Sequence, residues 1–260
     1  MPALHTSAYA SPPSKLLMFL EGGRALVELG ALAHAYPLLR AAPRGDGHSV
    51  LVLPGLIADD ASTALLRRYL AAQGYDPHGW KQGANRGPRV GVEQRMLDQL
   101  QELHATSGRT VSVIGWSLGG VYARELARRA PQAVRQVVTL GSPLRGAPTA
   151  TNAWRVYELA SGMSAHASDH HRHSEAPPVP STAIFSRSDG IVAWQCSLED
   201  DGPQTESIEV IGSHCGLGHH PAALYAIADR LAQPAGGWAP FERSGWRRAF
   251  YGTPEAPLAH

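Results

Sequence analysis

The sequence predicts an α/β fold, a mostly parallel sheet of about six strands with helices on both faces. Short apolar runs rich in β-branched residues alternate along the chain with segments whose apolar residues recur at helical spacing. With 260 residues, 43% of them hydrophobic, the chain can bury one full core and does not require two domains. The pentapeptide GWSLG at 115–119 lies between an apolar run and a helical segment, where parallel sheets carry reactive groups.

The N-terminal residues are predicted to precede the main domain. Residues 1–13 are rich in small residues and proline, which favours a disordered lead-in. Residues 14–48 are expected to form a helical extension, with one or two helices within 14–40, where leucines recur at helical spacing. The main domain is then expected to span residues 49–260.

No convincing targeting segment is recognised in this N-terminal region. The apolar run Leu16–Leu20 follows Lys15, as in a signal peptide, but Glu21–Arg24 interrupts it. The run is shorter than a usual signal core and too short to cross a bilayer. We therefore expect a cytoplasmic protein.

The elements of the main domain are assigned from apolar periodicity and from the glycine or proline residues at their ends. Gly74 and Gly108 each follow a helical segment as stop signals, and Pro221 occupies the first position of the last helix. The expected strands are 49–53, 110–114, 134–140, 182–186 and 206–211, with a weaker one near 75–80. The expected helices are 62–73, 92–106, 121–129 and 221–231.

Ser117 is the candidate nucleophile, because strand, G-x-S-x-G and helix follow one another in the order in which this motif carries chemistry. The turn is so sharp that its neighbours must be small, a need that Gly115 and Gly119 meet, while Gly120 lets the helix approach the sheet. The N-terminus of that helix favours a negative charge developing near the hydroxyl. The alternative is a structural turn of glycine and serine without a chemical role.

His214 is the candidate base that takes the proton of the serine hydroxyl, because it directly follows the last expected strand. His219 and His220 lie closer to the next helix, and we expect them to line a cleft or to cap that helix. A loop histidine without a chemical role remains the alternative for His214.

Asp189 is the candidate for the third group, which holds the imidazole in one tautomer and stabilises its protonated form. It follows a strand and precedes His214, which gives the chain order serine, aspartate, histidine. The competing acidic residues have no strand to position them, and we expect them to form a solvated loop; they are Glu199, Asp200 and Asp201.

Two backbone N–H groups are needed to stabilise the oxygen of a tetrahedral intermediate. One belongs to Leu118, the residue after the candidate nucleophile. The other is expected from Leu56, in the turn after the first strand, since Pro54 has no amide hydrogen and Gly55 permits the tight bend.

Five segments, in this order, resemble the bacterial lipases and esterases of the α/β-hydrolase superfamily: VLVLPGLIADD, VSVIGWSLGG, LGSPLRG, FSRSDGIVAW and VIGSHCGLGHHP. The resemblance runs from about Ser49 to Leu231 and is strongest to the smaller triacylglycerol lipases, with a more distant similarity to deacylases that remodel lipid anchors. It implies the α/β-hydrolase fold and the same catalytic and oxyanion residues that position and chemistry select. Two departures leave the substrate open: Pro54 replaces a frequent histidine, and residues 14–40 have no counterpart in the smallest members.

The predicted function is therefore the cleavage of carboxylic esters, such as acyl or lipid esters, through an acyl-enzyme. This chemistry requires no metal or organic cofactor. Two alternatives stay open. An acyltransferase or thioesterase would use the same triad with another acceptor or leaving group, and a non-catalytic scaffold of this fold would bind a lipid or a partner. The net charge of +1 gives no reason to expect nucleic acid, and the sequence does not fix the oligomeric state.

The segment 144–181 is longer than a crossover between two strands needs, and we interpret it as a lid insertion, with an inert surface insertion as the alternative. Four histidines within it suggest metal binding, but their polar, proline-rich surroundings favour simple solvation; they are His166, His170, His171 and His173.

Two further features concern the end of the chain. Cys196 and Cys215 both follow late strands, so a disulfide and two reduced thiols are both open. The stretch 238–251 is aromatic and basic and could contact a lipid surface, although packing against the body is the more common fate of such a tail.

Overall fold

The computed structural model of the protein describes residues 10–164 and 175–252. Its centre is a six-stranded sheet with the order β2-β1-β3-β4-β5-β6, in which every neighbouring pair is parallel. This confirms the predicted α/β fold. The strands are β1 (Ser49–Leu53), β2 (Asp76–Gly79), β3 (Val111–Trp116), β4 (Val134–Leu140), β5 (Ser181–Phe185) and β6 (Thr205–Glu209).

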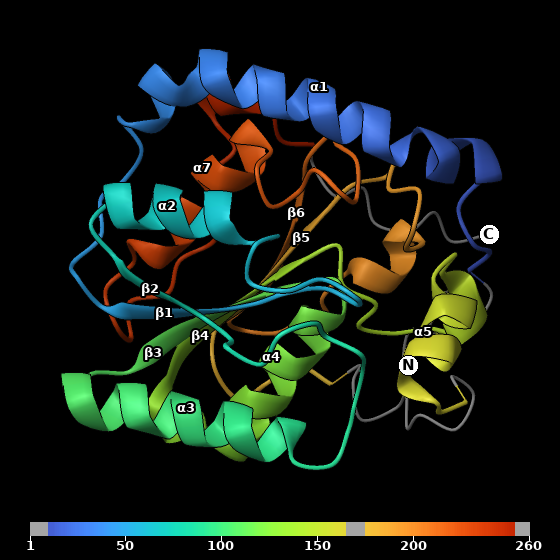
Figure 1. Cartoon of the computed structure of the whole chain (residues 1–260). Helices are drawn as coiled ribbons and strands as arrows, with labels where there is room; N and C mark the ends of the chain where they lie inside the picture. Colours follow the sequence, from blue (N-terminus) through green and yellow to red (C-terminus); the bar gives the residue numbers. More distant parts are fainter. Residues whose placement is uncertain (1–9, 165–174, 253–260) are drawn as a thin grey trace, which may run out of the picture.

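Helices cover both faces of the sheet (Figure 1). Three lie on one face: α1 (Lys15–Leu39), α2 (Ala64–Ala72) and α7 (Pro221–Leu231). Two lie on the other: α3 (Val92–Ser107) and α4 (Leu118–Arg129). The shorter helical segments are η2 (Pro131–Ala133), η3 (Pro148–Ala150), α5 (Trp154–Ser161), η5 (Trp194–Ser197) and η6 (Gly245–Ala249).

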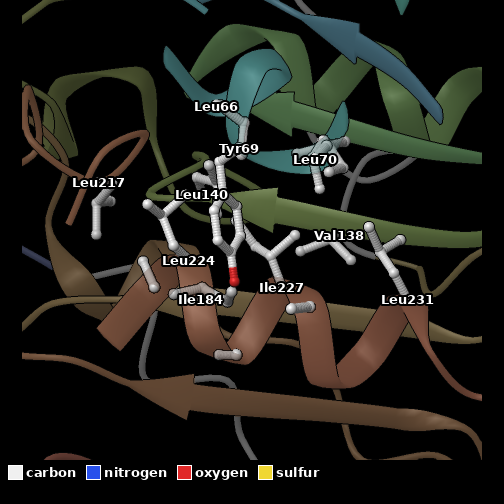
Figure 2. Packing of buried hydrophobic residues seen from close by; sticks show 14 of the residues in the cluster. Leu66, Tyr69, Leu70, Val138, Leu140, Ile184, Leu217, Leu224, Ile227 and Leu231 are labelled. Carbon is white, nitrogen blue, oxygen red and sulfur yellow. The ribbon is translucent and has the colours of Figure 1, made fainter. Parts of the chain in front are cut away.

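The alternation of side chains along the buried strands divides the core into two clusters. In β1, Val50 and Val52 belong to the cluster under α2 and α7, whereas Leu51 and Leu53 belong to the cluster under α3 and α4. All five residues of β1 are buried, as expected for a strand covered on both faces. Figure 2 shows the first cluster, where side chains of α2 and α7 meet those of β4 and β5. The labelled residues are Leu66, Tyr69, Leu70, Val138, Leu140, Ile184, Leu217, Leu224, Ile227 and Leu231.

The expected N-terminal extension is a single helix, α1, of 25 residues. It begins at an N-cap, because the Ser14 side chain accepts a hydrogen bond from the Leu17 N–H. Unlike a typical surface helix, α1 buries a charged side chain and exposes apolar ones, since Glu21 is buried while Phe19 and Leu26 are exposed. The helix packs against α7 at the edge of the sheet that carries the candidate site.

In its described residues, the insertion between β4 and β5 contains the short segment η3 and the helix α5, which ends at Gly162 in a left-handed conformation. The four histidines of this insertion lie outside the described residues. Among the residues that the structure describes, no group of three or more His, Cys, Asp or Glu could hold a metal ion. Within the same ranges, every helix is too short or too polar to cross a membrane.

Candidate active site

Ser117 lies in a strained turn between the end of β3 and the start of α4. Its φ of 53° and ψ of −121° form a conformation that a residue with a side chain seldom adopts. The Ser117 N–H donates to the Leu140 carbonyl at the end of β4, at 2.8 Å. Strain of this kind persists only where the surroundings impose it, so the turn holds the half-buried hydroxyl at the carboxyl end of the strands.

Three glycines make this turn sterically feasible, as the sequence predicts. A Cβ on Gly115 would overlap the Gly119 backbone, and one on Gly119 would overlap the carbonyl of Leu53. A Cβ on Gly120 would overlap the Ser142 side chain. Because the first two contacts are with backbone, neither can be relieved by a side-chain rotation.

Asp189 and His214 form a hydrogen-bonded pair at this edge of the sheet. The carboxylate Oδ2 and the imidazole Nδ1 are 2.7 Å apart, and both residues are buried. The other carboxylate oxygen, Oδ1, accepts from the amides of Ile191 and Val192 at 2.7 and 2.8 Å. The acid is thereby fixed by the backbone on one side, and its bond to Nδ1 makes Nε2 the ring nitrogen that can serve as a base.

The electrostatic surroundings favour the protonated form of His214. Burial lowers the pKa of the imidazole, but the charge and hydrogen bond of Asp189, together with the charge of Glu21, outweigh that effect. The net result is a pKa raised above its usual value. A base that must hold a proton during a reaction needs this direction of shift.

The elements that carry Ser117 and His214 are in direct contact. The indole N–H of Trp116, the residue before Ser117, donates to the His214 carbonyl at 3.1 Å. Gly141 follows β4 with a φ of 53°, and a Cβ there would lie 3.0 Å from both Asp189 Oδ2 and His214 Nδ1. The structure therefore brings the three predicted residues to one edge of the sheet.

The turn after β1, which carries Leu56, lies against the serine. The pairing of Leu53 with Gly115 aligns the ends of β1 and β3. A Cβ on Gly55 would lie 3.3 Å from the Ser117 Cβ. Ser117 therefore lies between Gly55, the residue before Leu56, and Leu118, the first residue of α4. The assignment of the Leu56 and Leu118 N–H groups as oxyanion donors stays a prediction.

The residue that fixes this turn is Asn85, which the sequence analysis missed. It is fully buried, and its side-chain amide donates to the Pro54 carbonyl at 2.9 Å. Its backbone accepts from the Ile57 N–H at 2.6 Å and donates to the Ala58 carbonyl at 2.8 Å. The only available signal was a single asparagine in the glycine-containing stretch GANRG at 83–87.

A second Ser–His–Asp arrangement occurs at the opposite end of the sheet. His48 Nε2 is 2.8 Å from the Ser112 hydroxyl, and its Nδ1 is 2.6 Å from Asp46 Oδ1. Ser112 is 0% exposed and His48 is 1% exposed, so a substrate cannot reach this serine. Arg109 and Arg135 also bind Asp46, at 2.5 and 3.0 Å. We interpret this arrangement as a structural link between the amino ends of the strands.

The two competing histidines, His219 and His220, lie at a contact with α1 and at the start of α7. His219 Nε2 contacts the Ala25 carbonyl of α1 at 2.9 Å, and His220 is the N-cap residue of α7. The Asp189 carboxylate is directed at His214 instead.

The expectation of a solvated acidic loop is wrong for Glu199. Its carboxylate is buried and pairs with Arg124 at 2.5 Å, while its other oxygen accepts from the Ser181 hydroxyl at 2.5 Å. Its neighbour Asp200 pairs with Arg145 at 2.9 Å and is partly exposed. The sequence could not show this, because Arg124 lies 75 residues away on α4.

The two cysteines are free thiols, so the disulfide considered above is absent from the structure. Cys196 lies in η5, buried in a small cluster with Ala150 and Val192. Cys215 is exposed on the side of α1, where its N–H donates to Glu21 Oε2. Burial raises the pKa of the Cys196 thiol to about 11, so this thiol stays protonated at neutral pH. The residue Cys215 is exposed overall, but partial burial of its thiol and the nearby carboxylates, Glu21 first among them, raise its pKa as well.

Parts of the sequence are similar to known proteins. Residues 93–201 match a family described as a PGAP1-like alpha/beta domain. A stretch of 60 residues, 23% of the chain, is 43% identical to triacylglycerol lipases from Pseudarthrobacter phenanthrenivorans and Burkholderia plantarii. The aligned stretch spans only 19% and 17% of the length of these relatives.

Solved structures of low sequence identity share the fold. Lipase B of Aspergillus fumigatus superposes with a TM-score of 0.57 at 16% identity, over 74% of this chain and 54% of that one. A lipase-esterase related protein from Clostridium acetobutylicum gives a TM-score of 0.56 at 13% identity, over 72% and 95% of the two chains. The chain therefore has the α/β-hydrolase fold, and it is similar to bacterial lipases and esterases of that superfamily.

Proposed function

We propose that this protein is a serine esterase that cleaves acyl or lipid esters through a covalent acyl-enzyme. The observation that carries the proposal is the bonded Asp189–His214 pair at the edge where a strained turn presents Ser117. The similarity to lipases supports an ester as the substrate class.

In the proposed reaction, the Ser117 Oγ attacks the ester carbonyl carbon while His214 Nε2 takes its proton. The carbonyl oxygen becomes an oxyanion, which the N–H groups of Leu56 and Leu118 would stabilise, each by about 3–4 kcal/mol. The intermediate collapses, and the alcohol leaves with the proton from His214. Water then cleaves the acyl-enzyme by the same steps, and Asp189 holds the imidazole in one tautomer throughout. The proposed chemistry uses no metal or organic cofactor.

A fluorophosphonate probe tests the proposal directly, because it reacts with activated serines. We expect one probe adduct by intact mass, mapped by peptide sequencing to Ser117. A protein that does not label would favour the non-catalytic scaffold. A chain-length series of chromogenic esters, with an amide, a thioester and an added alcohol acceptor, then separates an esterase from a thioesterase or an acyltransferase.

We also propose that the insertion at 144–181 forms part of the binding site for the acyl chain. Its helix α5 exposes Val156 at 42% and Leu159 at 89%, and Arg89 binds the Ala160 carbonyl at 2.9 Å. Exposed apolar side chains of this kind can contact a hydrophobic substrate.

For this lid proposal, we expect Leu159→Ser to lower kcat/KM for long acyl esters severalfold more than for acetate esters, since the lost contacts are with the chain. Leu38→Ser is the matched control, an exposed leucine at the end of α1. The measurement is kcat/KM across an ester series. Equal losses at every chain length would remove the case for a lid.

The aromatic C-terminal stretch packs against the body, as the common fate of such a tail suggests. Tyr251 is buried and donates to the Ala222 carbonyl at 2.9 Å, and Trp246 packs edge-on against Tyr225 at 5.0 Å. Nevertheless, Trp246 and Phe250 remain 57% and 55% exposed. We propose that these two rings contact a lipid surface when the substrate is a lipid.

This contact predicts that the protein co-sediments with phospholipid vesicles and that the double variant Trp246→Ser, Phe250→Ser reduces the bound fraction severalfold. The control is Val90→Ser, an exposed apolar residue before α3, on the other face of the sheet. Equal binding of the parent protein and both variants would exclude this tail as the contact.

A further inference from the structure

Three charged residues of α1, Glu21, Arg24 and Glu28, are directed toward the two loops that carry Asp189 and His214. Glu21 is 3% exposed and lies in the middle of this contact. Its Oε1 accepts from the Gly190 N–H at 2.8 Å, and its Oε2 accepts from the Cys215 N–H at 2.8 Å. A single carboxylate therefore joins the residue after the acid to the residue after the base.

The residues that precede Asp189 and His214, Ser188 and Ser213, are bound to α1 as well. Arg24 donates to the Ser188 carbonyl at 2.6 Å and to its hydroxyl at 2.7 Å. Glu28 accepts from the Ser213 N–H at 2.7 Å and from its hydroxyl at 2.6 Å. The acid and the base are thus each held from both sides by one helix.

The backbone of α1 lies directly on the acid loop, so this contact has little freedom. A Cβ on Gly190 would lie 2.5 Å from the carbonyl carbon of Leu17 and 2.6 Å from its oxygen. Only glycine allows the helix to approach this closely. The two loops are also joined at their bases, where the Ser186 hydroxyl donates to the Gly212 carbonyl at 2.6 Å, and Glu21 adds a second connection beyond Asp189 and His214.

The contacts of Glu21 are of the strong kind, because an ionised carboxylate accepts from two backbone amides in a buried place. An apolar residue at this position would leave both amides without these acceptors. The negative charge also acts on His214 through a medium of low dielectric, where it favours the imidazolium form.

We propose that Glu21 is a positioning residue of the proposed esterase, which joins the loops of Asp189 and His214 and stabilises the imidazolium formed when Ser117 attacks. This inference rests on the proposed function. Glu21 does not touch the reacting atoms and acts through the two loops. The N-terminal helix thereby becomes a part of the catalytic apparatus.

The test compares Glu21→Gln and Glu21→Asp in the full chain. Glutamine keeps the size of the side chain, but it removes the charge and presents an NH2 group to one of the two amides. We expect kcat for a short chromogenic ester to fall about ten- to a hundredfold, with a smaller change in KM. The acidic limb of the kcat–pH profile should move to lower pH, because that limb reports deprotonation of His214 and the charge of Glu21 raises the pKa of His214.

Glu21→Asp keeps the charge but is too short to reach both amides. It should lower kcat while displacing the acidic limb less than Glu21→Gln does. The matched control is Glu28→Gln, which changes a carboxylate of the same helix that binds Ser213 but does not join the two loops. Its acidic limb should move less than that of Glu21→Gln, because Glu21 is the carboxylate of α1 whose charge raises the pKa of His214.

Thermal unfolding of each variant identifies those that do not fold. If Glu21→Gln folds and keeps both the kcat and the pH profile of the parent protein, the proposal is wrong. A purely anchoring role predicts that Glu21→Gln and Glu28→Gln lose stability alike, with unshifted profiles, and this result would also overturn it. Failure of the proposed function itself is recognised separately, because the parent protein would then not label at Ser117 with a fluorophosphonate.

Discussion

Replacing Ser117 by alanine should lower the rate of ester hydrolysis by about four to six orders of magnitude, because no other group can form the acyl-enzyme. The variant should fold, since alanine has a similar volume at this half-buried position. His214→Ala should cause a comparable loss. Asp189→Ala should cost less, because an imidazole in the wrong orientation retains some basicity. Turnover of a chromogenic ester measures all three losses.

The second Ser–His–Asp arrangement supplies the control. Ser112→Ala removes a hydroxyl with a similar set of partners, but a fully buried one at the other end of the sheet. We expect it to retain the activity and the probe labelling of the parent protein, and to lose about 1–3 kcal/mol of stability from the unsatisfied His48. If Ser112→Ala were inactive and Ser117→Ala active, the assignment of the nucleophile would be reversed. His219→Ala likewise tests the base and should remain active.

Glu199→Ala should reduce the free energy of unfolding by about 3–5 kcal/mol, because it leaves the buried Arg124 without its carboxylate partner. Both side chains of this pair are 1% exposed, so water cannot replace the lost contact. The Ser181 hydroxyl loses its acceptor as well. Since a domain of this kind is stable by only about 5–15 kcal/mol, the variant should denature at a much lower concentration of urea.

Asp200→Ala is the matched control for this prediction. It removes the neighbouring carboxylate, which pairs with Arg145 but is 31% exposed, and it should cost about 1 kcal/mol or less. The double variant Arg124→Met, Glu199→Met should recover most of the stability, because apolar side chains of similar size need no partner. Equal urea midpoints for Glu199→Ala and Asp200→Ala would contradict the prediction that losing the buried ion pair destabilises the protein more than losing the partly exposed one.

The sequence predicted those parts of the fold that depend on local pattern. The buried strands β1 and β4 have the predicted bounds, because both are rich in β-branched and apolar residues and are followed by Pro54 and Gly141. The strand predicted at 206–211 instead ends at Glu209, and Ile211 is 79% exposed in the loop that leads to His214. The carboxyl-end rule for parallel sheets was enough to bring Asp189 and His214 together, since it needs only the order of the elements.

The residues that the sequence did not reveal are those whose partners are distant. Glu21 contacts residues 169 and 194 positions away, and Asn85 holds a turn about 30 positions upstream. Neither has a local motif, and a glutamate among leucines in a helix is usually read as its solvent-exposed side. The pairing of Cys196 and Cys215 could not be predicted for the same reason. The order of the strands places both residues at the same end of the sheet, but it does not show in which direction each side chain points.

The inward direction of the charges on α1 has a consequence for synthesis of the protein on the ribosome. The helix is translated before both loops, and the Cys215 amide that Glu21 binds is translated 194 residues after Glu21. At about 5–20 residues per second, the helix waits roughly 10–40 s for this partner, with its apolar side chains in water. The acid and base loops can therefore be joined only after Cys215 has been synthesised, so a nascent chain that stops before Cys215 has no assembled site.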